Sequence, residues 1–269
     1  MSDVILFDAA SARRRFRTEW LRPAAVGLAV PALLLLAWQG VAGAGWVAPH
    51  ILPSPAAVLA RFVVELRGGT FGADVRASLA RALGGFALGM PLGLAFGLML
   101  GLSRLAERLL GPTFLAYRQV AHFAWIPLIS MWFGGGEAGK LVFVSLSAFA
   151  PAVVNSWRGA RGIPAAYREL SAVLTFGRLD HLRLVALPAA LPGVLTGIRT
   201  ALIYAWLATV GAELFFDIAP GLAGRLNEGR DKFEVDLMIV ALAVLATLGL
   251  AFSRLAAAAE ARLLQRRRR

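Results

Sequence analysis

The chain has 269 residues, of which 58% are hydrophobic and only 16% are charged, and its mean hydropathy is +0.68. A soluble domain is typically about a quarter charged, so this composition excludes an ordinary soluble globular protein. The net charge of +12 would suit a nucleic-acid-binding protein if the basic residues formed one solvated patch, but they lie between apolar runs. The sequence has no cysteine, which excludes disulfide bonds, thiolate metal sites and thiol catalysis.

Six apolar segments approach the length of about 20 residues that a helix needs to cross a bilayer. They are residues 23–43, 79–102, 114–133, 141–157, 189–214 and 237–257. Because they lack the alternation of barrel strands, they predict helices. The expected fold is therefore an all-α, polytopic membrane protein with about six transmembrane helices. Its expected parts are a tail of residues 1–22, a membrane domain of residues 23–257 and a basic tail of residues 258–269.

The basic residues predict the orientation of the chain in the membrane. If the N-terminus is cytoplasmic, the cytoplasmic segments together contain 18 Arg and Lys residues and the outer segments contain 7. The positive-inside rule then predicts that both termini and residues 158–188 face the cytoplasm.

A glycine-rich segment at residues 134–140, ending in lysine, resembles a phosphate-binding loop. Leu141 follows where such a loop needs Ser or Thr, and an apolar span precedes the segment in place of a strand. We therefore expect an external turn here, and we expect the chain to be no enzyme and to hold no cofactor. The three histidines, His50, His122 and His181, lie on separate segments, so we expect no metal site.

Glycine occupies every fourth position of the second predicted span. The residues are Gly85, Gly89, Gly93, Gly97 and Gly101. This spacing keeps the glycines on one side of a helix, where the backbone of a neighbouring helix can approach closely. The stripe is expected to be a packing surface, and the sequence leaves open whether it also slides during a conformational cycle.

Residues 158–188 are too polar to span a membrane and too long for a simple connection. Pro164 is typical of a helix start and Gly177 of a helix end, while Pro188 precedes the fifth span. The sequence thus predicts a short helix between two spans, and an amphipathic helix resting on lipid is the alternative.

Glu169, with Leu187 and Pro188 at fixed spacing after it, resembles the Glu-Ala-Ala loop of a known family. The family is the permease subunits of binding-protein-dependent ABC importers, in the branch for nitrate, taurine and aliphatic sulfonates. The run Pro-Ala-Ala-Leu-Pro at residues 188–192 is similar to the branch's entry into its next span, and the resemblance covers roughly residues 50–265.

The loop departs from the family motif at three positions. Leu170 and Ser171 replace the two alanines, and Thr175 stands at the glycine position. In the family this loop docks on a cytoplasmic ATPase, so the resemblance implies that Glu169 anchors the helix while Ser171 and Ala172 fit a groove. The coupling residues implied are Glu169, Leu170, Ser171, Ala172, Thr175, Gly177, Leu187 and Pro188.

The resemblance implies a type I ABC importer permease in the bacterial inner membrane. Its expected partners are cytoplasmic ATPase subunits, an extracytoplasmic substrate-binding protein, a second permease copy and the lipid bilayer, without nucleic acid. The expected solute is a small anion such as a sulfonate, taurine or nitrate. A secondary transporter and an integral-membrane enzyme are the alternative interpretations.

Four polar residues fall within the predicted spans, where a charge costs at least about 2.5–3.5 kcal/mol. Arg118 and Glu213 are expected near opposite membrane interfaces. Asn155 and Arg199 are candidates for the translocation path, and Arg199 has helix packing or snorkelling as its alternative role.

Overall fold

The computed structural model describes residues 29–216 and 220–268, which form helices joined by turns and loops. In chain order the helices are Ala29–Gly43, α2 (Pro55–Arg67), α3 (Phe71–Leu102), α4 (Arg104–Tyr117), the 3-10 helix η1 (His122–Trp125), α5 (Ile126–Phe133), α6 (Glu137–Arg161), α7 (Ala165–Val173), α8 (Arg178–Asp180), the π-helix η2 (His181–Ala186), α9 (Leu187–Phe215), α10 (Leu222–Lys232) and α11 (Val235–Arg268). The prediction of an all-α, polytopic fold is confirmed.

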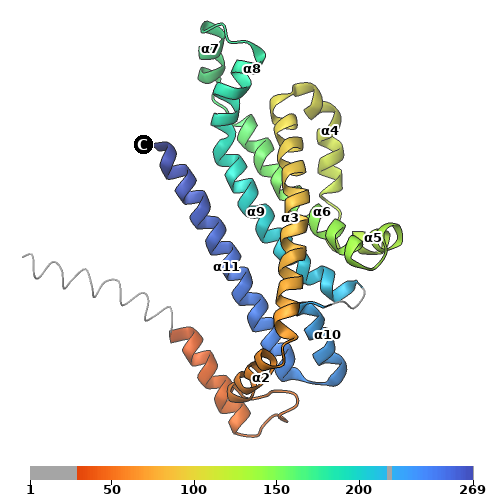
Figure 1. Cartoon of the computed structure of the whole chain (residues 1–269). Helices are drawn as coiled ribbons and strands as arrows, with labels where there is room; N and C mark the ends of the chain where they lie inside the picture. Colours follow the sequence, from red (N-terminus) through yellow and green to blue (C-terminus); the bar gives the residue numbers. More distant parts are fainter. Residues whose placement is uncertain (1–28, 217–219, 269) are drawn as a thin grey trace, which may run out of the picture.

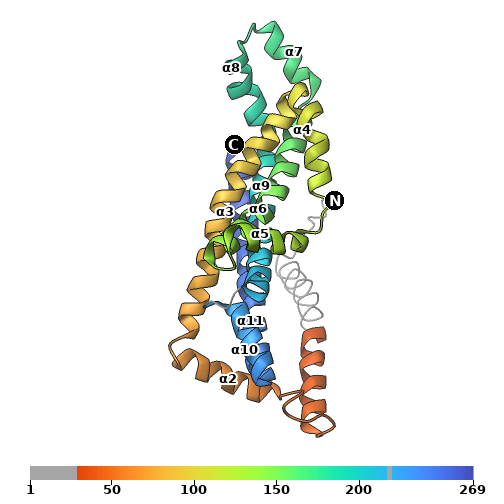
Figure 2. The same cartoon turned by 90° about the vertical axis from the view of Figure 1, so that its right-hand side faces the viewer.

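Four long helices form the bundle. Within the described residues, α3, α6, α9 together with η2, and α11 are long and apolar enough to cross a membrane. α6 packs along both α3 and α9, while α11 packs on α9 and α2. Figures 1 and 2 show α7 and α8 at one end of this bundle and α2 and α10 at the opposite end.

The third predicted span, residues 114–133, is wrong as a single helix. α4 ends at Tyr117, turns follow, and α5 has only eight residues. The amides of Gln119 and Val120 close these turns by bonding to carbonyls three residues back. The apolar composition of these residues predicts one continuous helix, but composition indicates burial and does not indicate where the backbone turns.

The second, fourth, fifth and sixth predicted spans are helical and longer than expected. α3 begins at Phe71, and the helix through η2 and α9 runs from His181 to Phe215. α11 continues to Arg268, so the predicted tail after residue 257 extends this helix. The described part of the first span is the helix Ala29–Gly43, whereas residues 1–28, including the predicted tail, lie outside the described part of the chain.

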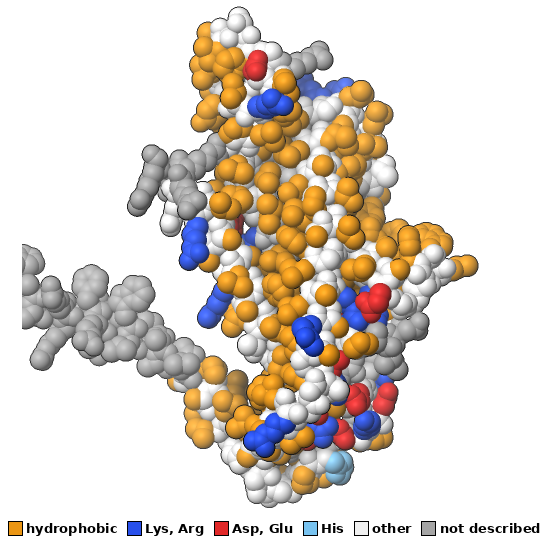
Figure 3. Space-filling model, viewed as in Figure 1, with side chains coloured by type: hydrophobic (Ala, Val, Ile, Leu, Met, Phe, Trp, Pro, Cys, Tyr) orange, Lys and Arg blue, Asp and Glu red, His pale blue; other side chains and the backbone are white. Residues whose placement is uncertain are grey.

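The helix surfaces are apolar in the middle of the bundle. Figure 3 shows hydrophobic side chains over the middle of one face and acidic side chains gathered towards the end with α10. Large hydrophobic side chains such as Leu92 on α3 and Leu250 on α11 are exposed. Such a surface is stable only in a hydrocarbon solvent or against another protein.

The glycine stripe of α3 lies against α6. A methyl group added at Gly93 would come within 2.5 Å of the Phe149 carbonyl oxygen and 2.7 Å of the Ala152 Cβ. At Gly101 it would lie 2.5 Å from the Cβ of Ala160. Because most of these obstacles are backbone or Cβ atoms, no rotamer change could relieve them.

We expect Gly93→Ala to destabilise the protein by about 1–3 kcal/mol, since the added methyl overpacks the contact with α6. Gly93→Leu should be worse. Gly72→Ala, on the same helix, is the control because nothing lies within 4 Å of its new Cβ. The thermal unfolding midpoint of each purified variant is the measurement. If Gly93→Ala and Gly72→Ala had equal midpoints, close packing of α3 against α6 would be contradicted.

Candidate functional site

A cavity of about 590 Å³ lies between α6, α9 and the segment that joins α4 to α5. The connecting segment contributes polar and aromatic side chains because it is not a continuous helix, so its residues can turn towards the bundle. The polar lining residues are Arg118, Gln119, His122, Ser147, Asn155 and Thr200, and the tyrosines Tyr117 and Tyr204 also line the cavity.

The structure places Asn155 on this cavity. Its side-chain amide donates to the Pro151 carbonyl at 2.8 Å and to the Thr200 hydroxyl at 3.0 Å. The second bond joins α6 to α9. These two bonds fix the orientation of the Asn155 side chain at the cavity wall.

The structure places Arg199 elsewhere. Its guanidinium lies 3.2 Å from the carboxylate of Glu260 on α11, and the Thr196 hydroxyl donates to the same carboxylate at 2.8 Å. Successive helical residues point about 100° apart, so Thr200 can face the cavity while Arg199 faces α11. Arg199 does not line the cavity, and its position matches the alternative role, a contact between packed helices.

α7 sits at the tip of the loop between α6 and α9. It begins at Ala165, directly after Pro164, and Glu169 lies exposed in its second turn, not at its start. The helix N-terminus therefore does not explain an acidic residue at this position. Tyr167, Leu170 and Val173 are each at least half exposed, so α7 presents an apolar face without a covering element.

Ser171 does not belong to that exposed face. It is 6% exposed, and its hydroxyl hydrogen-bonds the Nδ1 of His181 at 2.8 Å, which ties α7 to η2. The expectation that Ser171 fits a partner's groove is wrong for the described conformation, because an amphipathic helix turns this position inward. The backbone of Ala172 belongs to α7, and its side chain lies outside the described residues.

The helix end also differs from the prediction. α7 ends at Val173, and Thr175 has φ of 51°, in the left-handed region. Threonine is rare there because its β-carbon is branched, and glycine is the residue that this conformation favours. Gly177, the predicted end, precedes α8 instead. Leu187 and Pro188 open α9 directly after η2.

A polar cluster at the opposite end of the bundle caps α10. Three successive amides at its start each meet an oxygen from another helix: Gly221 with Asp74 at 3.0 Å, Leu222 with Ser78 at 2.9 Å and Ala223 with Glu213 at 2.9 Å. The first amides of a helix have no partner within it, so these side chains satisfy groups that would otherwise be buried unpaired.

Arg81 compensates the charge of Glu213. The two side chains, which are almost fully buried, lie 2.7 Å apart, and Arg81 also bonds Glu137 at 2.6 Å. The cluster thus joins α3, the start of α6 and the end of α9. Gly221 has no room for a side chain, since a Cβ would lie 2.6 Å from the Glu213 carboxyl carbon and 2.7 Å from the guanidinium.

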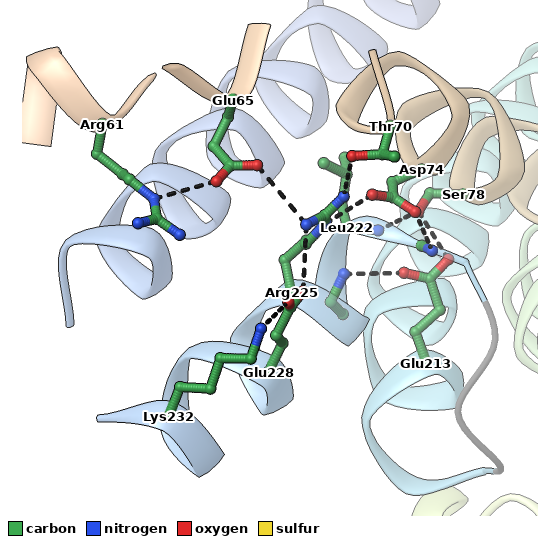
Figure 4. Close-up of polar contacts among 12 residues, drawn as sticks. Arg61, Glu65, Thr70, Asp74, Ser78, Glu213, Leu222, Arg225, Glu228 and Lys232 are labelled. Atoms are coloured by element: carbon green, nitrogen blue, oxygen red, sulfur yellow. Dashed lines mark hydrogen bonds and ion pairs between the residues drawn. The ribbon is translucent and has the colours of Figure 1, made fainter. Parts of the chain in front are cut away.

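Arg225 is a second arginine of the cluster, besides Arg81, that contacts several helices. Figure 4 shows it reaching from α10 towards Asp74 of α3 and Thr70, the residue before α3, each at 2.7 Å, and towards Glu65 of α2. On the outer side of α10, Lys232 hydrogen-bonds Glu228 and holds the pKa of that carboxyl below its usual value.

Sequence reasoning missed most of this cluster. Glu213 stood out as a charge in an apolar run, but its partner Arg81 lies 132 residues earlier. The one available signal was the presence of Asp74, Ser78 and Arg81 on one side of α3 at helical spacing. Among the residues that the structure describes, no three His, Asp or Glu side chains are placed to hold a metal ion.

Residues 89–265 match the family described as binding-protein-dependent transport system inner membrane component. The chain belongs to this family. It is 33% identical over 87% of its length to an aliphatic sulfonates transport permease of Bacillus subtilis, of which the match covers 83%. It is 40% identical over 87% of its length to a riboflavin transport permease of Chloroflexus aurantiacus, of which 86% is covered. A taurine transport permease of Escherichia coli is 28% identical, with 91% of both chains covered.

A solved structure supports the fold. An inward-facing methionine ABC transporter contains a chain that covers 76% of this one, with 94% of its own length matched, a TM-score of 0.55 and 20% identity. The chain is thus the permease subunit of an ABC importer, a multi-pass inner membrane protein without enzymatic activity. ATP hydrolysis belongs to a separate subunit, and a binding protein delivers the solute, which excludes the secondary transporter and the membrane enzyme.

We expect Arg81→Met to destabilise the protein by about 3–5 kcal/mol, because it leaves the Glu213 carboxylate buried without a counter-charge. Adding Glu213→Gln should recover part of this loss. Arg230→Met removes an exposed pair with Asp231 and should cost at most about 1 kcal/mol. Thermal unfolding measures all three, and an Arg81→Met variant as stable as the Arg230→Met control would show that the buried pair is unimportant.

We expect Thr175→Gly to stabilise the end of α7 by about 1 kcal/mol, since glycine adopts the left-handed conformation without strain. Thr175→Ala keeps the Cβ and loses the hydroxyl contact with the Leu174 carbonyl, so it should not stabilise. Amide hydrogen exchange across α7 is the measurement. Faster exchange in the glycine variant than in the native chain would refute a strained threonine.

Proposed function

We propose that two copies of this chain form the path for a small organic anion and that α7 is the element through which the ATPase drives it. Both termini and residues 158–188 then face the cytoplasm, and α2 and α10 face the binding protein. The basic-residue bias supports this orientation.

The observation that carries the anion assignment is the charge of the cavity. Arg118 is the one Lys or Arg side chain along its described lining, and no described lining residue is acidic. Arg118 also has no ion-pair partner among the described residues, so its charge is available to a solute. Sulfonates and taurine, after which the relatives are named, carry an anionic sulfonate group that an arginine can bind.

The position of α7 supports its coupling role. Its apolar face and Glu169 are exposed at the tip of the bundle, and η2 joins the loop to α9 without a break. α9 in turn carries Thr200 and Tyr204 of the cavity. A partner that moves α7 therefore acts on a helix that lines the path.

The homodimer is supported by the exposed apolar surface of the protomer. Met131, Trp132 and Phe133 at the end of α5 are each at least half exposed. The connecting segment before α5 lines the cavity, so a second copy seated against this side would close the path from the lipid.

We expect Glu169→Lys to weaken binding of the ATPase about tenfold or more, because it reverses the one acidic charge on the exposed side of α7. Insertion should be unaffected, since the residue lies outside the apolar spans. Pull-down of the ATPase and binding-protein-stimulated ATP turnover in the reconstituted complex measure the effect.

Asp231→Lys is the matched control for the pull-down, being a charge reversal on an exposed acidic residue at the other end of the molecule. It should leave ATPase binding unchanged. If Glu169→Lys also left pull-down and turnover unchanged, α7 would not be the coupling element.

A further inference from the structure

The cavity between α6, α9 and the α4–α5 segment has an aromatic lining that a very small anion would not use. Tyr117, Phe123, Trp125 and Tyr204 all contribute to it. Its volume of about 590 Å³ lies in the range of cavities that hold drug-sized ligands, about 300–1,000 Å³. A solute as small as nitrate would leave most of this surface uncovered.

Two of these rings come from different walls and are open to a ligand. Tyr204 on α9 and Phe123 in η1 are each 53% exposed. Phe123 packs against Phe143 and Phe215, whereas Tyr204 has no hydrogen bond or ring contact within the described part of the chain. An aromatic ring entering the cavity could make offset or edge-to-face contacts with both.

The polar groups complement this aromatic surface. Arg118 carries the unpaired charge. Asn155 adds an amide whose orientation is fixed by Pro151 and Thr200.

We infer that this cavity binds an anion that carries an aromatic ring, with the ring against Tyr204 and Phe123 and the anionic group towards Arg118. The inference rests on the proposed role of the cavity as part of the path and narrows its solute. It selects ring-bearing sulfonates or carboxylates over alkyl sulfonates of the same charge.

The native chain lacks cysteine, so a single Leu207→Cys variant places the only thiol on the cavity lining. The permease in complex with its ATPase, in lipid nanodiscs, is treated with a small thiol reagent in the presence of naphthalenesulfonate or ethanesulfonate. Naphthalenesulfonate should slow labelling at least tenfold more than ethanesulfonate at equal concentration. Leu250→Cys, exposed on α11 away from the cavity, is the control and should label equally with either anion.

Three variants in the Leu207→Cys background assign the contacts. Tyr204→Leu should remove most of the protection by naphthalenesulfonate, and Tyr204→Phe should keep it, since the ring is retained. Arg118→Gln should reduce protection by either anion.

Equal protection by the two sulfonates would overturn the aromatic preference and leave the proposed path for anions intact. Protection by neither would overturn both the preference and the assignment of this cavity to the path. Naphthalenesulfonate protection that also appears at Leu250→Cys would show partitioning into lipid and would equally overturn the inference. The ATPase pull-down with Glu169→Lys tests the coupling role of α7 independently of these three labelling outcomes.

Discussion

The close contact between α3 and α6 is the constraint on which the other features of the structure depend. Lipid is as apolar as a leucine side chain, so helices in a membrane associate through close packing more than through hydrophobic burial. The glycines of α3 allow the backbone of α6 to approach, and α6 repeats the device on its other side, where Gly159 faces Gly193 of α9. With α6 held between two helices, its remaining side faces the α4–α5 segment, and the cavity lies there.

The polar cluster at the α10 end solves a second problem of the bundle. α9 must stop and the chain must return as α10, which leaves backbone amides at the end of a packed bundle. Asp74 and Glu213 satisfy these amides with carboxylates, and Arg225 and Arg81 balance the carboxylate charges. Such a cluster is worth most when complete, since removing one member leaves its partner buried and unpaired. It therefore fixes one end of α3 and α9, while at the other end the bond between Ser171 and His181 ties α7 to η2.

The sequence predicts the long helices and the family, because apolar length and motif spacing are local properties. It does not predict the break between Tyr117 and Ile126, because the polar residues there, Arg118, Gln119 and His122, are flanked on both sides by residues as apolar as those of a span. It fails for Ser171 because the motif gives a position in the chain and does not give the side of α7 that faces η2. Arg199 and Asn155 show the same limit. Both are polar residues in apolar runs. Only the packing of the helices places Asn155 on the cavity and pairs Arg199 with Glu260.

α9 connects the α7 end of the bundle to the cavity. From η2 to Phe215 the chain is helical without a break, and Leu187 lies about 25 Å from Tyr204 along a helix rising 1.5 Å per residue. A helix is stiff over such a length, so a displacement imposed on the loop must appear at Thr200 and Tyr204 unless it is absorbed on the way. The π-helical turn at η2 is the place where it could be absorbed, because its backbone bonds are less regular than those of an α-helix. If α7 has the coupling role proposed above, the Asn155–Thr200 bond would transmit what remains to α6, and the glycine contacts would transmit it to α3.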